Sequence, residues 1–224
     1  MRNGKGFGIG RAATVLVLGA VAVPALTGTA SAATISLSSA GKLAKAGVQV
    51  TGDLSGWTVQ PGSLEKGAGS GSDATPFSCG GDRQVAYLAG DSAMGNKGGT
   101  LILTGSAVTK SIGAAESDLA VSRSAKGTKC VAKALGADAL GSSGSMTVKR
   151  LSSEVSGADE GAVFRIVMKE AVGGQTYEVN GYLVEARVGR TELSVYSENA
   201  STKAPSPSQA TKLMRRMASR VRHA

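Results

Sequence analysis

Apolar and polar residues alternate through the second half of the chain, and this pattern predicts β-strands. Phe164, Ile166 and Met168 occupy every second position between polar residues, which is the period expected of a strand with one face against a core. Glycine-containing turns at 173–174 and 188–190 separate the later strands. Four consecutive strands joined by such turns predict an antiparallel meander. The expected strands lie around 146–148, 164–169, 177–187 and 193–195.

A helical repeat closes the chain. Ser206, Pro207 and Gln209 form a capping-box pattern with proline at the first helical position. The apolar residues that follow recur at helical spacing, namely Ala210, Leu213, Met214, Met217 and Val221. The opposite side carries basic residues at four-residue steps, namely Lys212, Arg216 and Arg220. The apolar stripe is expected to pack on the meander with the basic side in water. The functional alternative is contact of the basic side with an anionic surface such as lipid head groups or wall polymers.

The first half of the chain has weaker periodicity and more small residues. Residues 33–40 are small and polar and predict a flexible N-terminal arm. The stretch 62–76 is rich in Gly and Ser and predicts a loop. The other expected elements are a short helix at 42–48, strands at 83–89 and 100–109 around a turn at 90–99, a helix at 110–125 and a further helix around Cys130.

The first 32 residues have the organisation of a secretory signal peptide. Three basic residues, Arg2, Lys5 and Arg11, precede an apolar run over 12–26, and Ala30-Ser31-Ala32 follows it. The most apolar part, 14–23, is shorter than the roughly 20 residues that a spanning helix requires. The mature chain is therefore expected to begin at Ala33, to be secreted and extracellular, and to have no transmembrane anchor.

The charge of the chain is concentrated near its C-terminus. The formal net charge is +9, but residues 33–202 contain 16 basic and 16 acidic residues, so the six basic residues beyond 202 give the mature chain +6. Nucleic-acid binders usually spread basic residues over a face and place aromatic residues among them. Because only 4% of this chain is aromatic, we expect no nucleic-acid partner.

Two cysteines, Cys79 and Cys130, occur in a chain that is expected to meet an oxidising environment. Paired thiols tend to close there, so we predict one disulfide between them. Closing a loop of this length stabilises a fold by about 4 kcal/mol in the chain-entropy model. A redox role is disfavoured, because the two residues lack the close Cys-x-x-Cys spacing.

Few residues are suited to catalysis. His223 is the only histidine and is the penultimate residue, which excludes histidine triads and histidine metal sites. Ser-x-x-Lys spacings begin at Ser39 and Ser63 without a Lys-Thr-Gly motif, so chance explains them best. Trp57 is the only tryptophan; it is expected to fill a core, and the alternative is that it lines a ligand groove. We predict no cofactor, no metal ion and no enzymatic activity.

Several of these features together resemble the extracellular sensor domain of the mycobacterial PknH-type serine/threonine kinases and related secreted actinobacterial proteins. The resemblance is carried by the short helix ahead of 53–57, the pair Cys79 and Cys130, the segment 184–189 ahead of Leu193, and the closing helix. It implies a two-layer α+β fold with an antiparallel sheet of about four to six strands and helices packed on one face. It also implies a role in binding an extracellular ligand. This chain has no kinase domain and one cysteine pair rather than two, and no ligand residue can be carried across.

The sequence therefore predicts a signal peptide at 1–32, a flexible arm at 33–40 and a single α+β sensor-like domain at 41–224. The leading hypothesis is a secreted, non-enzymatic binding domain for a small, lipid-like or cell-wall ligand, acting as a monomer. Two alternatives remain open. One is a secreted inhibitor or protein-partner module that acts through the loop 62–76, and the other is an enzyme that uses Ser, Lys and carboxylates alone.

Overall fold

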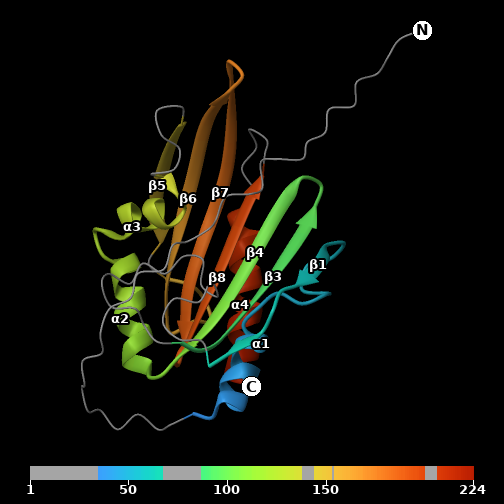
Figure 1. The fold of residues 1–224 in the computed structure, drawn as a ribbon, viewed down its shortest axis with the longest axis vertical. Helices are drawn as coiled ribbons and strands as arrows, with labels where there is room; N and C mark the ends of the chain where they lie inside the picture. The colour runs from blue at the N-terminus through green and yellow to red at the C-terminus, as the bar shows by residue number, and fades with distance from the viewer. Residues whose placement is uncertain (1–34, 68–86, 138–143, 153, 200–205) are drawn as a thin grey trace.

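The computed structural model describes residues 35–67, 87–137, 144–152, 154–199 and 206–224. Within these ranges, eight strands form one antiparallel sheet and four helices pack against it (Figure 1). The strands are β1 (Thr58–Pro61), β2 (Glu65–Lys66), β3 (Tyr87–Lys97), β4 (Thr100–Thr109), β5 (Gly144–Ser152), β6 (Glu160–Val172), β7 (Gln175–Val188) and β8 (Thr191–Asn199). The helices are α1 (Leu37–Ala46), α2 (Ile112–Arg123), α3 (Gly127–Ala134) and α4 (Pro207–Arg222). The predicted signal peptide lies outside the described residues.

The sheet order is β1-β3-β4-β8-β7-β6-β5, with β2 paired to β3. The meander expected from the alternating pattern is confirmed, since β5, β6, β7 and β8 pair in sequence order. The sheet is larger than predicted, because β8 also pairs with β4 and thereby joins the β1 to β4 strands to the meander.

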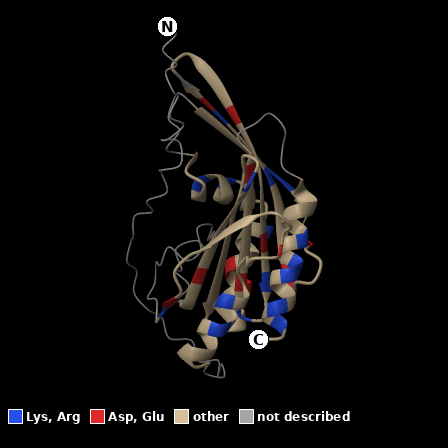
Figure 2. Ribbon diagram, turned by 90° about the vertical axis from the view of Figure 1, so that its right-hand side faces the viewer, with Lys and Arg blue, Asp and Glu red and all other residues tan. Residues whose placement is uncertain are grey.

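The α+β class is confirmed, but the helices do not share one face of the sheet. Along β7, Val184 and Ala186 pack against α4, whereas Leu183 belongs to the cluster that contains Val131 of α3. Neighbouring residues of a strand point to opposite faces, so α1 and α4 cover one face and α2 and α3 the other (Figures 1 and 2). The expected two-layer arrangement is therefore wrong. The short α2 and α3 were predicted as helices, but their sequences do not indicate which face they cover.

The α4 helix follows its predicted pattern closely. It buries the whole apolar stripe, from Ala210 to Val221, against β7 and β8. Ser206 is the N-cap and Pro207 opens the helix, as expected, although the Ser206 side chain makes no capping hydrogen bond. Its hydroxyl lies 2.6 Å from that of Ser208 instead.

Two expectations for the first half are wrong. Helix α1 begins at Leu37 rather than at 42, because Ser36 caps it by accepting from the Ser39 amide and Ala40 is fully buried. Residues 37–40 are therefore helical and not a flexible arm. The stretch 90–97, expected as a turn, forms most of β3. Its small residues allow close packing on the α1 face, as at Gly95, where a Cβ would lie 2.7 Å from the Gln49 side chain.

Candidate functional site

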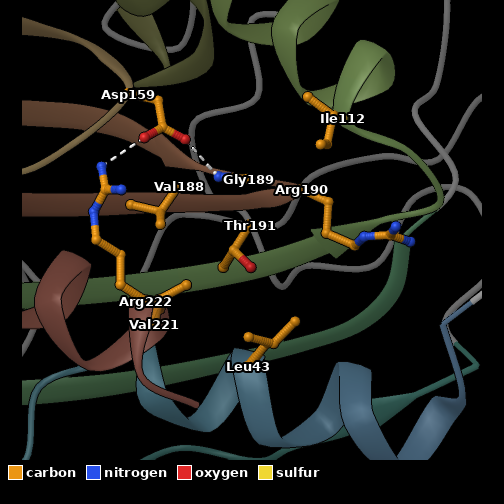
Figure 3. Close-up of a pocket in the computed structure, with 9 residues that line it drawn as sticks. All are labelled: Leu43, Ile112, Asp159, Val188, Gly189, Arg190, Thr191, Val221 and Arg222. Atoms are coloured by element: carbon orange, nitrogen blue, oxygen red, sulfur yellow. Dashed lines mark hydrogen bonds and ion pairs between the residues drawn. The ribbon is translucent and has the colours of Figure 1, made fainter. Parts of the chain in front are cut away.

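A cleft of about 380 Å³ lies at the end of the sheet where β7 turns into β8. Five parts of the chain that are distant in sequence meet there: α1, the start of α2, Asp159 just before β6, the β7–β8 turn and the end of α4 (Figure 3). The lining residues are Leu43, Ile112, Asp159, Val188, Gly189, Arg190, Thr191, Val221 and Arg222. Apolar walls with a few polar groups are typical of small-molecule sites.

The β7–β8 turn places the centre of the cleft. Val188 pairs with Thr191, which leaves Gly189 and Arg190 as the two turn residues. Gly189 has a φ of 59°, a conformation that glycine adopts without steric cost. The Arg190 carbonyl accepts hydrogen bonds from both the amide and the hydroxyl of Thr109 at the end of β4. The turn is thereby fixed to the neighbouring strand.

Asp159 anchors the polar side of the cleft. Its carboxylate accepts from the Gly189 amide at 2.7 Å and from Arg222 at 2.5 Å. The backbone hydrogen bond from Gly189, followed by the contact with Arg222, lowers the pKa of Asp159 below its usual value. This carboxylate is therefore ionised at neutral pH and already bound to the β7–β8 turn and to α4.

Arg187 connects this polar side of the cleft to α2. The Arg187 side chain is 7% exposed and lies 3.3 Å from Glu116 of α2, 3.6 Å from Asp159 and 3.7 Å from Glu160. It also donates to the Gly189 carbonyl at 2.8 Å. A buried arginine with several carboxylate neighbours fixes positions more than it adds stability. Its contacts hold α2, β6 and the turn in one arrangement around the cleft.

Thr191 supplies a hydroxyl that the described part of the protein does not use. The residue is 1% exposed, and its Oγ1 has no hydrogen-bond partner among the described groups. In Figure 3, Thr191 lies amid the other lining residues, between Val188 and Arg190. A buried hydroxyl without a partner costs free energy, so a ligand group that bonded to it would recover that cost.

A second polar group lies beneath α2, away from the cleft. Glu185 of β7 is 6% exposed, and Asp118 and Ser122 of α2 are also buried. Burial, with a smaller contribution from the charge of Asp118, raises the pKa of Glu185 to about 7, although a hydrogen bond from Ser122 favours the ionised form. The Glu185 Oε2 atom has no partner among the described groups. This group lies under a helix with no described cleft beside it, so we treat it as a structural feature that responds to pH.

The predicted site residues do not lie together in the cleft. Trp57 is half-buried and packs against the core cluster that contains the buried residues of α4, as expected for a tryptophan that fills a core. It does not line the described cleft. Cys130 lies in α3. Cys79 lies outside the described residues, so the disulfide remains a prediction. The loop 62–76 falls largely outside them as well.

The basic side of α4 is divided between protein contacts and water (Figure 2). Arg220 donates to the carbonyls of Ala46 and Val48 and pairs with Asp53 at 2.7 Å. Arg216 donates to the Asp53 carbonyl. Lys212 is exposed. Arg216 and Arg220, two of the three residues considered as contacts for an anionic surface, therefore hold the segment after α1 against α4. The four-residue spacing did not reveal this structural role.

The cleft residues were missed because each looks ordinary in the sequence. Leu43 and Val221 read as core positions of helices, and Val188 as the end of a strand. The turn at 188–190 was identified, but nothing in its sequence indicates which helices lie beside it. The signal that was available, an apolar strand end joined to an arginine-containing turn, is common in proteins without a ligand.

Two solved structures have a similar arrangement of the chain. One is an uncharacterised protein of Mycobacterium smegmatis, the Rv0999 ortholog, which is 14% identical with a TM-score of 0.49 over 80% of this chain and 96% of that one. The other is the extracellular domain of PknH from Mycobacterium tuberculosis, which is 9% identical with a TM-score of 0.41 over 75% of this chain and 86% of that one. No protein-family model and no curated protein matches the sequence.

No described helix has the length and apolar character needed to span a membrane. No cluster of three or more His, Cys, Asp or Glu residues within the described ranges is arranged to hold a metal ion.

Proposed function

We propose that this chain is a secreted, non-enzymatic binding domain that recognises a small, lipid-like or cell-wall ligand outside the cell. The observation that carries the proposal is the cleft at the β7–β8 end of the sheet. Its volume of about 380 Å³ is within the range of roughly 300–1,000 Å³ found for small-molecule sites. Its walls are mainly apolar, and its polar groups are few.

The chemistry at the cleft favours binding over catalysis. Asp159 is the only acidic residue of the lining, and its lowered pKa and its bond to Arg222 make it a poor general acid or base at neutral pH. Neither Arg190 nor Arg222 is a nucleophile. Thr191 has no base among its neighbours in the lining.

Native mass spectrometry of the protein recovered from the culture medium of its own host tests this proposal. We expect a discrete mass above that of the polypeptide, lost on denaturation. Ile112→Glu places a charge at the mouth of the cleft and should abolish the extra mass. Leu37→Glu is a matched control, since Leu37 and Ile112 are each 48% exposed and each is the first residue of its helix.

The control should retain the ligand. A bare polypeptide under conditions that preserve the fold, or equal loss of the ligand from both variants, would contradict a binding role for this cleft. Recovery of a folded partner protein in place of a small molecule would favour the protein-partner alternative.

A further inference from the structure

The polar groups of the cleft restrict the charge of its ligand. Its charged side chains are bound within the protein, whereas one uncharged hydroxyl has no partner among the described groups. We propose that the cleft binds a neutral aliphatic molecule with a single hydroxyl group, whose hydrocarbon chain lies against α1 and α4 and whose hydroxyl bonds to Thr191. This inference rests on the proposed binding function and assigns a ligand class to it.

The three charged residues of the lining each have partners within the protein. Asp159 accepts from the Gly189 amide at 2.7 Å and from Arg222 at 2.5 Å. Arg190 donates to the Lys110 carbonyl at 3.1 Å and has a further interaction within the protein. A charged ligand would have to give up its hydration here without a free counter-charge, which is costly beside apolar walls. The lining therefore favours a ligand without a formal charge.

The apolar wall suits a flexible hydrocarbon chain. Val188 and Val221 are 6% and 5% exposed, and Leu43 of α1 lies on the same wall (Figure 3). All three are aliphatic, and no aromatic residue lines the described cleft. Aromatic side chains are the usual platform on which nucleobases stack. Aliphatic walls instead favour chains that bury CH₂ groups.

Thr191 supplies the hydrogen-bonding group that such a ligand would use. The residue is 1% exposed, and its Oγ1 has no partner among the described groups. In Figure 3 its side chain lies between the β7–β8 turn and Leu43 of α1. Rotation about χ1 between staggered positions turns this hydroxyl toward a ligand in the cleft. Because a hydroxyl can both donate and accept, an alcohol pairs with Thr191 in either direction.

The test is calorimetric titration of the full mature chain with three compounds of equal chain length, octan-1-ol, octanoate and octylammonium, and with butan-1-ol. We expect octanol to bind at least about tenfold more tightly than either ion, because each ion loses hydration without a free counter-charge. Butanol lacks four CH₂ groups and should bind about a hundredfold more weakly than octanol. Tighter binding of octanoate or of octylammonium than of octanol would overturn the assignment in favour of an anionic or a cationic ligand.

Variants at one position isolate the role of the hydroxyl. Thr191→Val keeps the shape of the side chain and should weaken octanol binding by about tenfold. Thr191→Ser keeps the hydroxyl and should retain most of the affinity. Thr147→Val is the matched control, because Thr147 is an exposed threonine of β5 outside the lining. This control should bind octanol as the parent does.

Equal affinity for octanol and the two ions, or an unchanged affinity for octanol in Thr191→Val, would overturn the inference. These failures are distinct from failure of the proposed function. If octanol does not bind but the protein from the host medium carries another ligand that Ile112→Glu loses, the cleft is a binding site and the ligand class is wrong. If no ligand is found by either method, both are wrong.

Discussion

Helices α4 and α2 pack on opposite faces of the same two strands, β7 and β8, yet they do so with different chemistry. The buried residues of α4 are all apolar and include Leu213, Met214 and Met217. Half of the buried residues of α2 are polar, namely Asp118 and Ser122, and Glu185 of β7 faces them. One face is therefore stabilised mainly by packing, and the other contains a buried carboxyl group, Glu185, whose cost depends on pH.

The largest expected effect is on the α4 face. Leu213 is fully buried, so Leu213→Ala removes apolar contacts and leaves a cavity. We expect the free energy of unfolding to fall by about 3 kcal/mol, within the usual range for such changes. Urea denaturation measures it. A loss below about 1 kcal/mol would mean that α4 contributes little to the core, and the contrast between the two helices would not hold.

On the α2 face, we expect the stability to depend on pH through Glu185. Its pKa is raised from 4.5 to about 7 in the folded protein, so the folded state retains a proton that the unfolded state has lost. The free energy of unfolding therefore falls as the pH rises from about 4.5 to 7, by up to about 3 kcal/mol, and stays low above that. The charge of Asp118 adds to this rise in the pKa of Glu185.

Glu185→Gln removes this dependence, because the amide does not titrate. We expect the variant to be more stable than the parent at pH 8, with the advantage shrinking toward pH 5. Urea denaturation across this pH range measures the difference. Glu170→Gln, an exposed glutamate of β6, is the control and should follow the parent's profile. A constant difference between Glu185→Gln and the parent would show that Glu185 is not the source of the pH dependence.

At the edge of the α4 face, charged residues have a structural role. Arg220 is 30% exposed and bonds to Ala46, Val48 and Asp53. Arg220→Ala should reduce the free energy of unfolding by about 2 kcal/mol, since Asp53 is 7% exposed and loses its cation. Lys212→Ala, on the same side of α4 but exposed, should change it by less than about 0.5 kcal/mol. Equal effects would place Arg220 among solvated surface charges.

The sequence predicted best those elements whose pattern alone determines their packing. The alternation in β6 predicted a strand and the stripe of α4 predicted an amphipathic helix, and both elements are present. In β3 the alternation is masked by Gly90, Ala93 and Gly95; at Gly95 a Cβ would lie 2.7 Å from the Gln49 side chain, in the segment that follows α1. Small residues of this kind are typical of turns, and only pairing with the neighbouring strands identifies this segment as a strand.

The same limit explains why the buried charges and the cleft were not predicted. Asp118 and Glu185 are 67 positions apart in the numbering, and each looks like a solvated carboxylate until α2 is placed on β7. Leu43 and Val221 lie at opposite ends of the described chain. Their proximity depends on the β4–β8 pairing, which joins the two halves of the sheet and which no local pattern specifies.

The smallest expected effect concerns one of the buried polar groups on the α4 face of the sheet. Thr191 lies on this face with a hydroxyl that has no described partner, so Thr191→Val exchanges an unpaired buried polar atom for a methyl group. We expect the free energy of unfolding to rise by about 1 kcal/mol, measured without added ligand. A loss of similar size would show that the hydroxyl is bonded within the folded protein, and would remove it as a donor to a ligand. A gain in stability would instead confirm that the buried Thr191 hydroxyl is a polar atom whose burial costs free energy in the folded protein.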